Sequence, residues 1–122
     1  MMIVDIDAEV IHGRKIGRAL GYPTANMSLD GYESVERGVY RSEVVIDGVR
    51  YVTMSNVGVR PSVGGKELLL ETHVIGFHGD LYGRRLCVRL VEKIRDEKRF
   101  GSISDLKEQL TRDYNYIRNF AL

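Results

Sequence analysis

Two polar residues follow a proline in a short segment and could together bind a metal ion. Thr24 and Asn26 flank Ala25, directly after Pro23. Proline holds the chain extended, and alternate residues of an extended strand point to the same side. A hydroxyl and an amide oxygen on one side suit Mg²⁺, which completes its shell with waters and phosphate oxygens. The open alternative is a plain strand start whose polar residues face solvent.

The segment before this proline is rich in glycine and in basic residues, a composition that suits phosphate groups. Glycine lets the backbone approach a ligand closely, and basic side chains bind phosphate oxygens. The segment is not a Walker A loop, because G-x-x-x-x-G-K-[ST] occurs nowhere in the sequence. A solvated loop without a ligand is the alternative. The glycines and basic residues concerned are Gly13, Arg14, Lys15, Gly17, Arg18 and Gly21.

One carboxylate lies inside an otherwise apolar segment and could act as a base. Glu71 occurs within Leu68–Phe77, LLLETHVIGF. A carboxylate in apolar surroundings needs a partner or has a functional role. The alternative is a structural carboxylate exposed at the rim of a barrel.

Alternation of apolar and polar residues dominates the chain and predicts about six strands that position these groups. Asp47-Gly48 favours the positive φ angles of a tight hairpin, and His78-Gly79-Asp80 predicts a further turn. Short strands joined by turns indicate a closed or nearly closed β-barrel. Two stretches, 12–26 and 57–66, are expected to be irregular loops. The predicted strands are Ile3–Ile11, Thr24–Leu29, Val39–Ile46, Val49–Val57, Leu68–Phe77 and Leu86–Ile94.

The end of the chain changes to helical periodicity and predicts one helix packed on the barrel. Ser102 precedes Asp105 by three residues and predicts the N-terminal cap, with Ser104 as the alternative. The apolar stripe consists of Ile103, Leu106, Leu110, Tyr114 and Ile117. The charged residues expected mostly off that stripe are Lys107, Glu108, Arg112 and Asp113.

Composition sets bounds on the class of protein. The 122 residues suffice for one domain, which we assign to residues 1–122, and no apolar run approaches the ~18 residues of a membrane helix. The formal net charge of +1 lacks the basic excess of a general nucleic-acid binder. The N-terminus has acidic residues and no basic flank, so it does not resemble a signal peptide, and we expect a cytoplasmic protein.

The cysteine and histidine content predicts neither a zinc site nor a disulfide. The single cysteine, Cys87, is expected to be a small buried apolar residue. His12, His73 and His78 lack metal-ligand spacing, so surface or hydrogen-bonding roles are expected for them.

Taken in order, these motifs resemble the riboflavin kinase family across nearly the whole chain. The Pro-Thr-Ala-Asn motif after a glycine-rich segment is a highly specific part of the resemblance. The segments that carry it are His12–Leu20, Gly21–Asn26, Gly38–Tyr40, Asn56–Gly58 with Arg60-Pro61, Glu71–His73, Asp80–Gly83 and Ile94–Phe100. The resemblance implies an all-β fold, a six-stranded Greek-key β-barrel with a C-terminal helix. It also implies an enzyme that moves the γ-phosphoryl group of ATP to the ribityl 5′-hydroxyl of riboflavin, giving FMN and ADP.

The resemblance also implies roles for individual residues. Glu71 would be the base for the ribityl hydroxyl, and Thr24 and Asn26 would hold Mg²⁺, for which Zn²⁺ or Mn²⁺ could substitute. The positions implied for the nucleotide are Gly13, Arg18, Thr24, Val74, Gly76 and Tyr82. The positions implied for the flavin are Arg95, Lys98 and Phe100.

The partners implied are small molecules: riboflavin, FMN, ATP and ADP. No nucleic acid and no membrane is implied, and we expect a monomer. Many bacterial relatives carry an N-terminal adenylyltransferase domain that makes FAD. This sequence starts almost directly at the expected barrel, so FMN rather than FAD is the product expected of it.

Two other functions stay open from the sequence. A non-catalytic barrel that holds FMN as a sensor or regulator would keep the flavin contacts and could dispense with Glu71 and Asn26. A nucleic-acid-binding barrel is the other, since small barrels often have this role, but the near-neutral charge argues against it.

Overall fold

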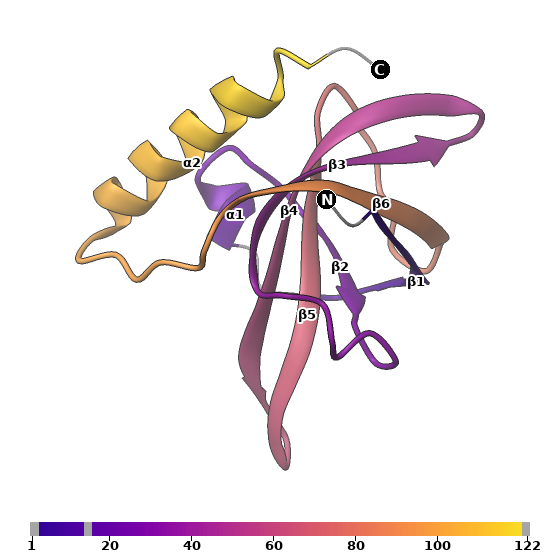
Figure 1. Ribbon diagram of the computed structural model, residues 1–122, viewed down its shortest axis with the longest axis horizontal. Coiled ribbons are helices and arrows are strands. Elements are labelled where there is room, and N and C mark those ends of the chain that lie inside the picture. Colours follow the sequence, from indigo (N-terminus) through magenta and orange to yellow (C-terminus); the bar gives the residue numbers. More distant parts are fainter. Residues whose placement is uncertain (1–2, 14–15, 121–122) are drawn as a thin grey trace.

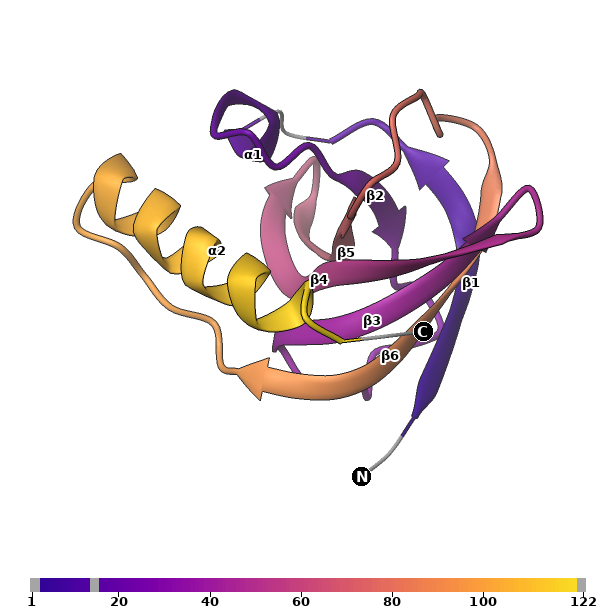
Figure 2. The ribbon, with the colours of Figure 1, turned by 90° about the horizontal axis from the view of Figure 1, so that it is seen from above.

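The computed structural model describes residues 3–13 and 16–120, and its strands close into a barrel (Figures 1 and 2). The strands follow the order β1-β2-β5-β4-β3-β6 around the barrel, and every neighbouring pair is antiparallel. Strands β3, β4 and β5 are consecutive neighbours and β6 returns beside β3, which is Greek-key connectivity. The predicted fold class is therefore confirmed. The strands are β1 (Val4–Ile11), β2 (Ala25–Ser28), β3 (Gly38–Ile46), β4 (Val49–Ser62), β5 (Gly65–Val74) and β6 (Arg85–Arg95).

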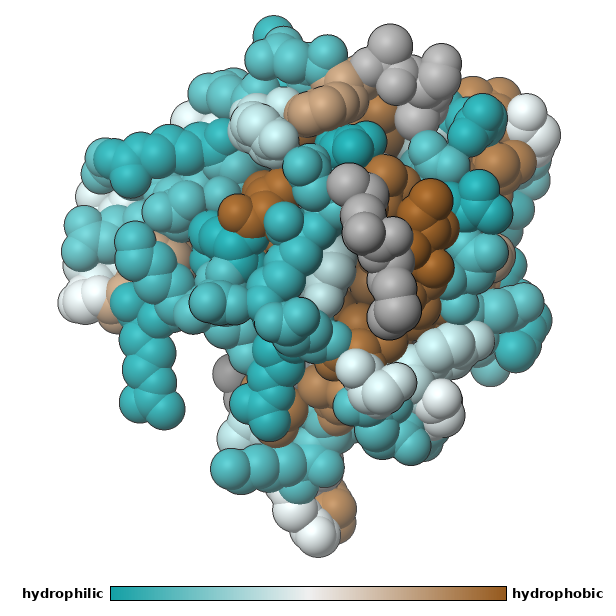
Figure 3. All heavy atoms as spheres, in the orientation of Figure 1, coloured by the Kyte–Doolittle hydropathy of each residue, from teal (hydrophilic) through white to brown (hydrophobic). Residues whose placement is uncertain are grey.

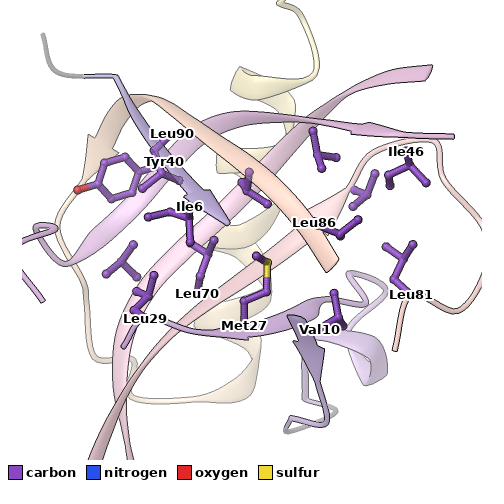
Figure 4. Close-up of a cluster of buried hydrophobic side chains, with 14 residues drawn as sticks. Ile6, Val10, Met27, Leu29, Tyr40, Ile46, Leu70, Leu81, Leu86 and Leu90 are labelled. Atoms are coloured by element: carbon purple, nitrogen blue, oxygen red, sulfur yellow. The ribbon is translucent and has the colours of Figure 1, made fainter. Parts of the chain in front are cut away.

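One face of each strand fills the barrel with apolar side chains (Figure 4). Ile6, Met27 and Leu70 are completely buried there. On β6, Leu86 and Leu90 point into this core, whereas Cys87 is exposed. The prediction of a buried Cys87 is wrong because strict alternation along a strand places the residue after Leu86 on the outer face.

Two hairpins connect β3 to β4 and β4 to β5. The first has the predicted turn, with φ of 51° at Asp47 and 81° at Gly48. The second replaces the irregular loop expected at 57–66, because β4 continues to Ser62 and pairs directly with β5. Pro61 is tolerated in this extension because β3 pairs with β4 only as far as Val57, which leaves an open edge beyond it.

Helix α2 (Ile103–Ile117) lies outside the barrel, at the end of the chain (Figure 2). Its predicted cap is confirmed, since Ser102 Oγ accepts a hydrogen bond from the Asp105 amide at 3.1 Å. Ile117 packs against Val39 and Met54 on the outer side of the barrel wall. The surface over α2 is mainly hydrophilic (Figure 3).

The segment between β1 and β2 has a short helix, α1 (Ile16–Ala19), where the sequence predicts a loop. Arg14 and Lys15 of that segment lie outside the described residues. Across the ranges that the structure describes, neither helix is long and apolar enough to cross a membrane.

Candidate active site

A row of side chains crosses the outer face of the barrel at the level of the predicted base. Glu71 of β5 lies opposite Asn26 of β2 on one side and opposite Asn56 of β4 on the other. Directly opposed residues share a face of the sheet. Leu70, the neighbour of Glu71, fills the barrel interior, so Glu71 points outward together with both asparagines. The pairing of distant strands therefore assembles two amides around one carboxylate.

Of the two residues predicted to bind a metal, Asn26 lies near the start of β2 and Thr24 immediately precedes that strand. Asn26 is only 4% exposed, and its Nδ2 donates a weak hydrogen bond to the Thr24 carbonyl oxygen at 3.4 Å. Among the described residues, the buried Oδ1 of Asn26 accepts no hydrogen bond. Buried oxygens are normally satisfied, and an amide oxygen is a hard ligand, so this atom fits a cation such as Mg²⁺.

The two candidate metal ligands, Thr24 and Asn26, offer a hydroxyl oxygen and an amide oxygen. Within residues 3–13 and 16–120, no three or more His, Cys, Asp or Glu side chains are grouped to hold a metal ion. A cation held by a hydroxyl and an amide needs further oxygen ligands, which nucleotide phosphates and water can supply.

Gly13 packs its backbone directly on the Asn26 side chain. A Cβ atom at position 13 would lie 2.2 Å from Asn26 Cγ and 2.4 Å from its Oδ1. No side chain fits at such distances, so the absence of one at Gly13 lets the segment after β1 close over the Asn26 amide. Gly13, which was expected to lie close to a bound substrate, is thus in close contact with the side chain of Asn26, a candidate metal ligand.

A cavity of about 610 Å³, here called the larger cavity, opens where β1 and β5 end and β2 begins. Beside Asn26, it is lined by five residues for which the family resemblance implies nucleotide contacts: Gly13, Arg18, Thr24, Val74 and Tyr82. Gly76 is not among its lining residues and lies in the turn after β5, at a φ of 84°. The volume is within the range of small-molecule sites.

His12, for which the sequence predicts a surface or hydrogen-bonding role, lines the larger cavity. Its ring stacks on that of Tyr82, with centroids 3.6 Å apart and planes 16° apart. The stack joins the end of β1 to the segment between β5 and β6, so it forms a wall of the cavity from two distant segments.

A cavity of about 330 Å³, here called the smaller cavity, lies between the barrel and α2. It contains Glu71 and the three residues predicted to contact the flavin: Arg95, Lys98 and Phe100. A second carboxylate, Glu97, lies beside them. Its apolar walls suit a flat ring system and come from Leu20, Tyr22, Val39, Met54, Leu106 and Leu110.

The two cavities adjoin, because Thr24 and His73 line both of them. Asn26 lines the larger cavity and Glu71 the smaller one, and these two residues are directly opposed across β2 and β5. A group carried by a ligand in the larger cavity could therefore be passed to a ligand in the smaller cavity at this boundary.

His73 is held in place at that boundary. Its Nδ1 lies 2.8 Å from the Pro23 carbonyl oxygen, and since a carbonyl only accepts, Nδ1 carries the proton. The ring meets Tyr22 edge-on, with centroids 5.5 Å apart. Burial lowers the pKa of His73, so the imidazole is neutral at neutral pH. This is a hydrogen-bonding role, one of the two kinds that the sequence left open.

Arg95 is fixed by a residue that sequence reasoning missed. Its Nε and Nη2 donate to the Asp113 carboxylate of α2, at 3.1 Å and 2.8 Å respectively, and Gln109 donates to the same carboxylate at 3.0 Å. Asp113 was expected off the apolar stripe, but it is only 4% exposed. The signal was available, because Asp113 stands three residues after Leu110 and four before Ile117, within the stripe itself.

A family model and several known proteins are similar to this chain. The family model described as Flavokinase: Riboflavin kinase matches residues 2–121. The bifunctional riboflavin kinase/FMN adenylyltransferase of Escherichia coli (strain K12) is 42% identical over 116 residues, which are 94% of this chain and 37% of that protein. The chain thus spans well under half the length of this curated relative.

Two solved structures are similar to the whole chain. One is described as a macrolide-efflux protein from Streptococcus pneumoniae, with a TM-score of 0.81 and 32% identity, covering 96% of this chain and 39% of that one. The other is riboflavin kinase from Trypanosoma brucei, with a TM-score of 0.69 over 98% of this chain and 80% of that one. At 19% identity, the second similarity shows the fold alone. Since the family model spans nearly all of the sequence, the chain belongs to the riboflavin kinase family.

Proposed function

We propose that this chain transfers the γ-phosphoryl group of ATP to the ribityl 5′-hydroxyl of riboflavin, giving FMN and ADP. The observation that carries the proposal is the boundary between the two cavities, where Asn26 and Glu71 are directly opposed. ATP would occupy the larger cavity and riboflavin the smaller one. Membership of the riboflavin kinase family supports this choice of substrates.

Glu71 would act as the general base. It lines the smaller cavity next to the boundary, where the end of the ribityl chain would meet the γ-phosphate. As the bond between the 5′-oxygen and the γ-phosphorus forms, the hydroxyl proton passes to the carboxylate, and the bond from that phosphorus to the β-phosphate oxygen breaks. ADP leaves with the electron pair of that bond. The phosphoryl group is thus transferred without a covalent enzyme intermediate.

Thr24 and Asn26 would hold the divalent cation. A bound Mg²⁺ neutralises charge on the phosphates and orients them. The two residues offer only oxygen donors, which favours Mg²⁺ or Mn²⁺ over Zn²⁺, a cation that prefers nitrogen and sulfur. The Oδ1 of Asn26, which accepts no hydrogen bond within residues 3–13 and 16–120, supports this assignment.

The remaining assigned residues would position the two substrates. Gly13 and Arg18 line the larger cavity, where a backbone amide and a guanidinium can approach phosphates. Phe100 offers an aromatic face for the flavin, and Lys98 Nζ lies 6.0 Å from that ring's centroid. We expect the enzyme to be a monomer and to be cytoplasmic.

The proposal is tested by incubating the protein with riboflavin, ATP and MgCl₂ and separating the flavins by chromatography with fluorescence detection. FMN and ADP should form in equal amounts, and chelation of the metal should stop the reaction. Riboflavin that binds but is never phosphorylated would overturn the proposal in favour of a flavin-binding barrel without turnover.

A further inference from the structure

We propose that His73 is a positioning residue of the metal site, which acts by fixing the peptide unit that presents Thr24. The proposal rests on the proposed function of that site. His73 itself is assigned no contact with the cation. Its role is to hold the segment on which one of the two candidate ligands is carried.

The two candidate metal residues are not held equally by the barrel. Asn26 is inside β2, paired with Ile11 of β1 on one side and with Glu71 of β5 on the other. The ladder between β2 and β5 begins at Ala25, so Thr24 lies one residue outside it. Backbone pairing therefore fixes Asn26, and Thr24 needs another constraint.

The hydrogen bond from His73 supplies that constraint. The Pro23 carbonyl and the Thr24 nitrogen belong to one planar peptide unit, so a bond to the oxygen fixes the orientation of the whole unit. The proline ring already fixes φ at residue 23. The remaining freedom is rotation about ψ of Pro23, and the 2.8 Å bond to His73 Nδ1 restrains it.

The imidazole is itself held on two sides by aromatic rings. It meets Tyr22 at an interplanar angle of 87°, and the centroid of Tyr114 of α2 lies 6.1 Å away. The Tyr22 hydroxyl in turn lies 3.1 Å from Thr111 Oγ1 of the same helix. Both rings are therefore tied to α2, and the donor is held by the helix that closes the smaller cavity.

A pair of amide substitutions separates this role from general packing. In His73→Asn the amide nitrogen is attached to Cγ, as Nδ1 is in histidine, so it can still donate to Pro23. In His73→Gln the nitrogen is one bond further out and falls nearer the position of Nε2. Both variants lose the ring, so any effect of the ring on packing or on the smaller cavity is common to both. His73→Ala removes the donor altogether.

The measurement is ADP affinity by calorimetry, with Mg²⁺ and with a chelator, and the readout is the ratio of the two affinities. We expect His73→Gln and His73→Ala to lower this ratio about fivefold, the effect of one neutral hydrogen bond, with ADP affinity in chelator unchanged. His73→Asn should keep the ratio of the unmodified protein. Circular dichroism of each variant verifies that it is folded.

The outcomes are distinct. A His73→Asn variant that behaves like His73→Gln, or a ratio that stays the same in all three variants, would overturn the positioning role while leaving FMN formation by the unmodified protein untouched. If the ADP affinity of the unmodified protein does not depend on Mg²⁺, the metal site and this proposal are both overturned. Failure of the proposed function itself would appear separately, as absence of FMN from the unmodified protein.

Discussion

Arg95 of β6 and Asp113 of α2 form a two-point ion pair that ties the helix to the barrel beside the smaller cavity. The Asp113 side chain is 5% exposed and that of Arg95 is 19% exposed, so the pair is largely removed from water. Arg95 lines the cavity, as do Leu106 and Leu110 from the helix. The pair therefore connects one cavity wall to the other and holds the guanidinium in a fixed orientation.

Asp113→Asn should lower both stability and riboflavin affinity. The substitution keeps the shape but leaves a partly buried guanidinium without its counter-charge, which should cost about 1–3 kcal/mol in free energy of unfolding. Chemical denaturation and a riboflavin fluorescence titration measure the two effects. Glu108→Gln is the matched control, because its pair with Arg112 on the same helix is exposed at both residues, and little change is expected. Equal effects of the two substitutions would argue against the Arg95–Asp113 pair as the link between the walls of the smaller cavity.

Asn26→Ala should raise the Mg²⁺ concentration required for FMN formation. The substitution removes a candidate oxygen ligand, and the lost Oδ1 accepts no hydrogen bond among the described residues, so we expect function to suffer more than stability. Initial rates across a magnesium titration test this. Asn56→Ala is the control, since Asn56 is the amide opposite Glu71 on the other side and lines only the smaller cavity. An identical magnesium dependence in both variants would remove Asn26 from the metal site.

Gly13→Ala should impair the same metal-dependent step through a steric effect. Its Cβ would lie 2.2 Å from Asn26 Cγ, so either the amide rotates or the segment after β1 moves away. The matched control is Gly101→Ala, whose Cβ would find its nearest neighbour, Asp105 Oδ2, at 3.8 Å. If the clash acts through Asn26, adding Asn26→Ala to Gly13→Ala should cause little further loss of activity. Additive losses would show that Gly13 acts independently of the amide.

Local patterns in the sequence predicted the six strands and the C-terminal helix, but not α1 or the extension of β4 to Ser62. Alternation of apolar and polar residues predicted the strands, Asp47-Gly48 predicted a hairpin turn, and Ser102 predicted the start of the helix. The shared side of Thr24 and Asn26 was inferred in the same way and stays a prediction, as do the binding roles of the site residues. The irregular loop expected at 57–66 is wrong: proline and glycine favour loops, but the extended hairpin accommodates Pro61 and the neighbouring glycines at an open edge of β4.

Local sequence patterns could not predict contacts between residues that are far apart in the chain. The bond between His73 and Pro23 joins positions 50 residues apart, and only the register of β2 on β5 brings them together. The same holds for Asp113, whose burial depends on Arg95 lying opposite the helix. Leu106 and Leu110 were expected to be part of a packed stripe, yet they are only half-buried and line the smaller cavity. Helical spacing predicts which face points inward but does not distinguish a packed core from a cavity wall.

Glu71→Gln should keep riboflavin binding and lose most turnover. Glutamine has nearly the same shape but cannot accept the hydroxyl proton at neutral pH. A general base contributes about 10²–10⁴-fold, which at about 1.36 kcal/mol per decade is roughly 3–5 kcal/mol of barrier. The loss should appear in kcat, with riboflavin affinity changed far less. Rapid-mix measurement of FMN formation, beside a fluorescence titration of riboflavin, separates the two quantities.

Two other carboxylates serve as controls for Glu71. Glu67 is on the same strand and pairs with Arg60 away from both cavities, so Glu67→Gln should leave kcat within a few-fold. Glu97 shares the smaller cavity but is exposed and is not in the row with Asn26, so Glu97→Gln should retain most of the turnover. If Glu97→Gln loses the turnover and Glu71→Gln keeps it, the base is Glu97. Near-native kcat in both would mean that the ribityl proton leaves without a carboxylate of this cavity, and transfer would then depend on the cation and on positioning alone.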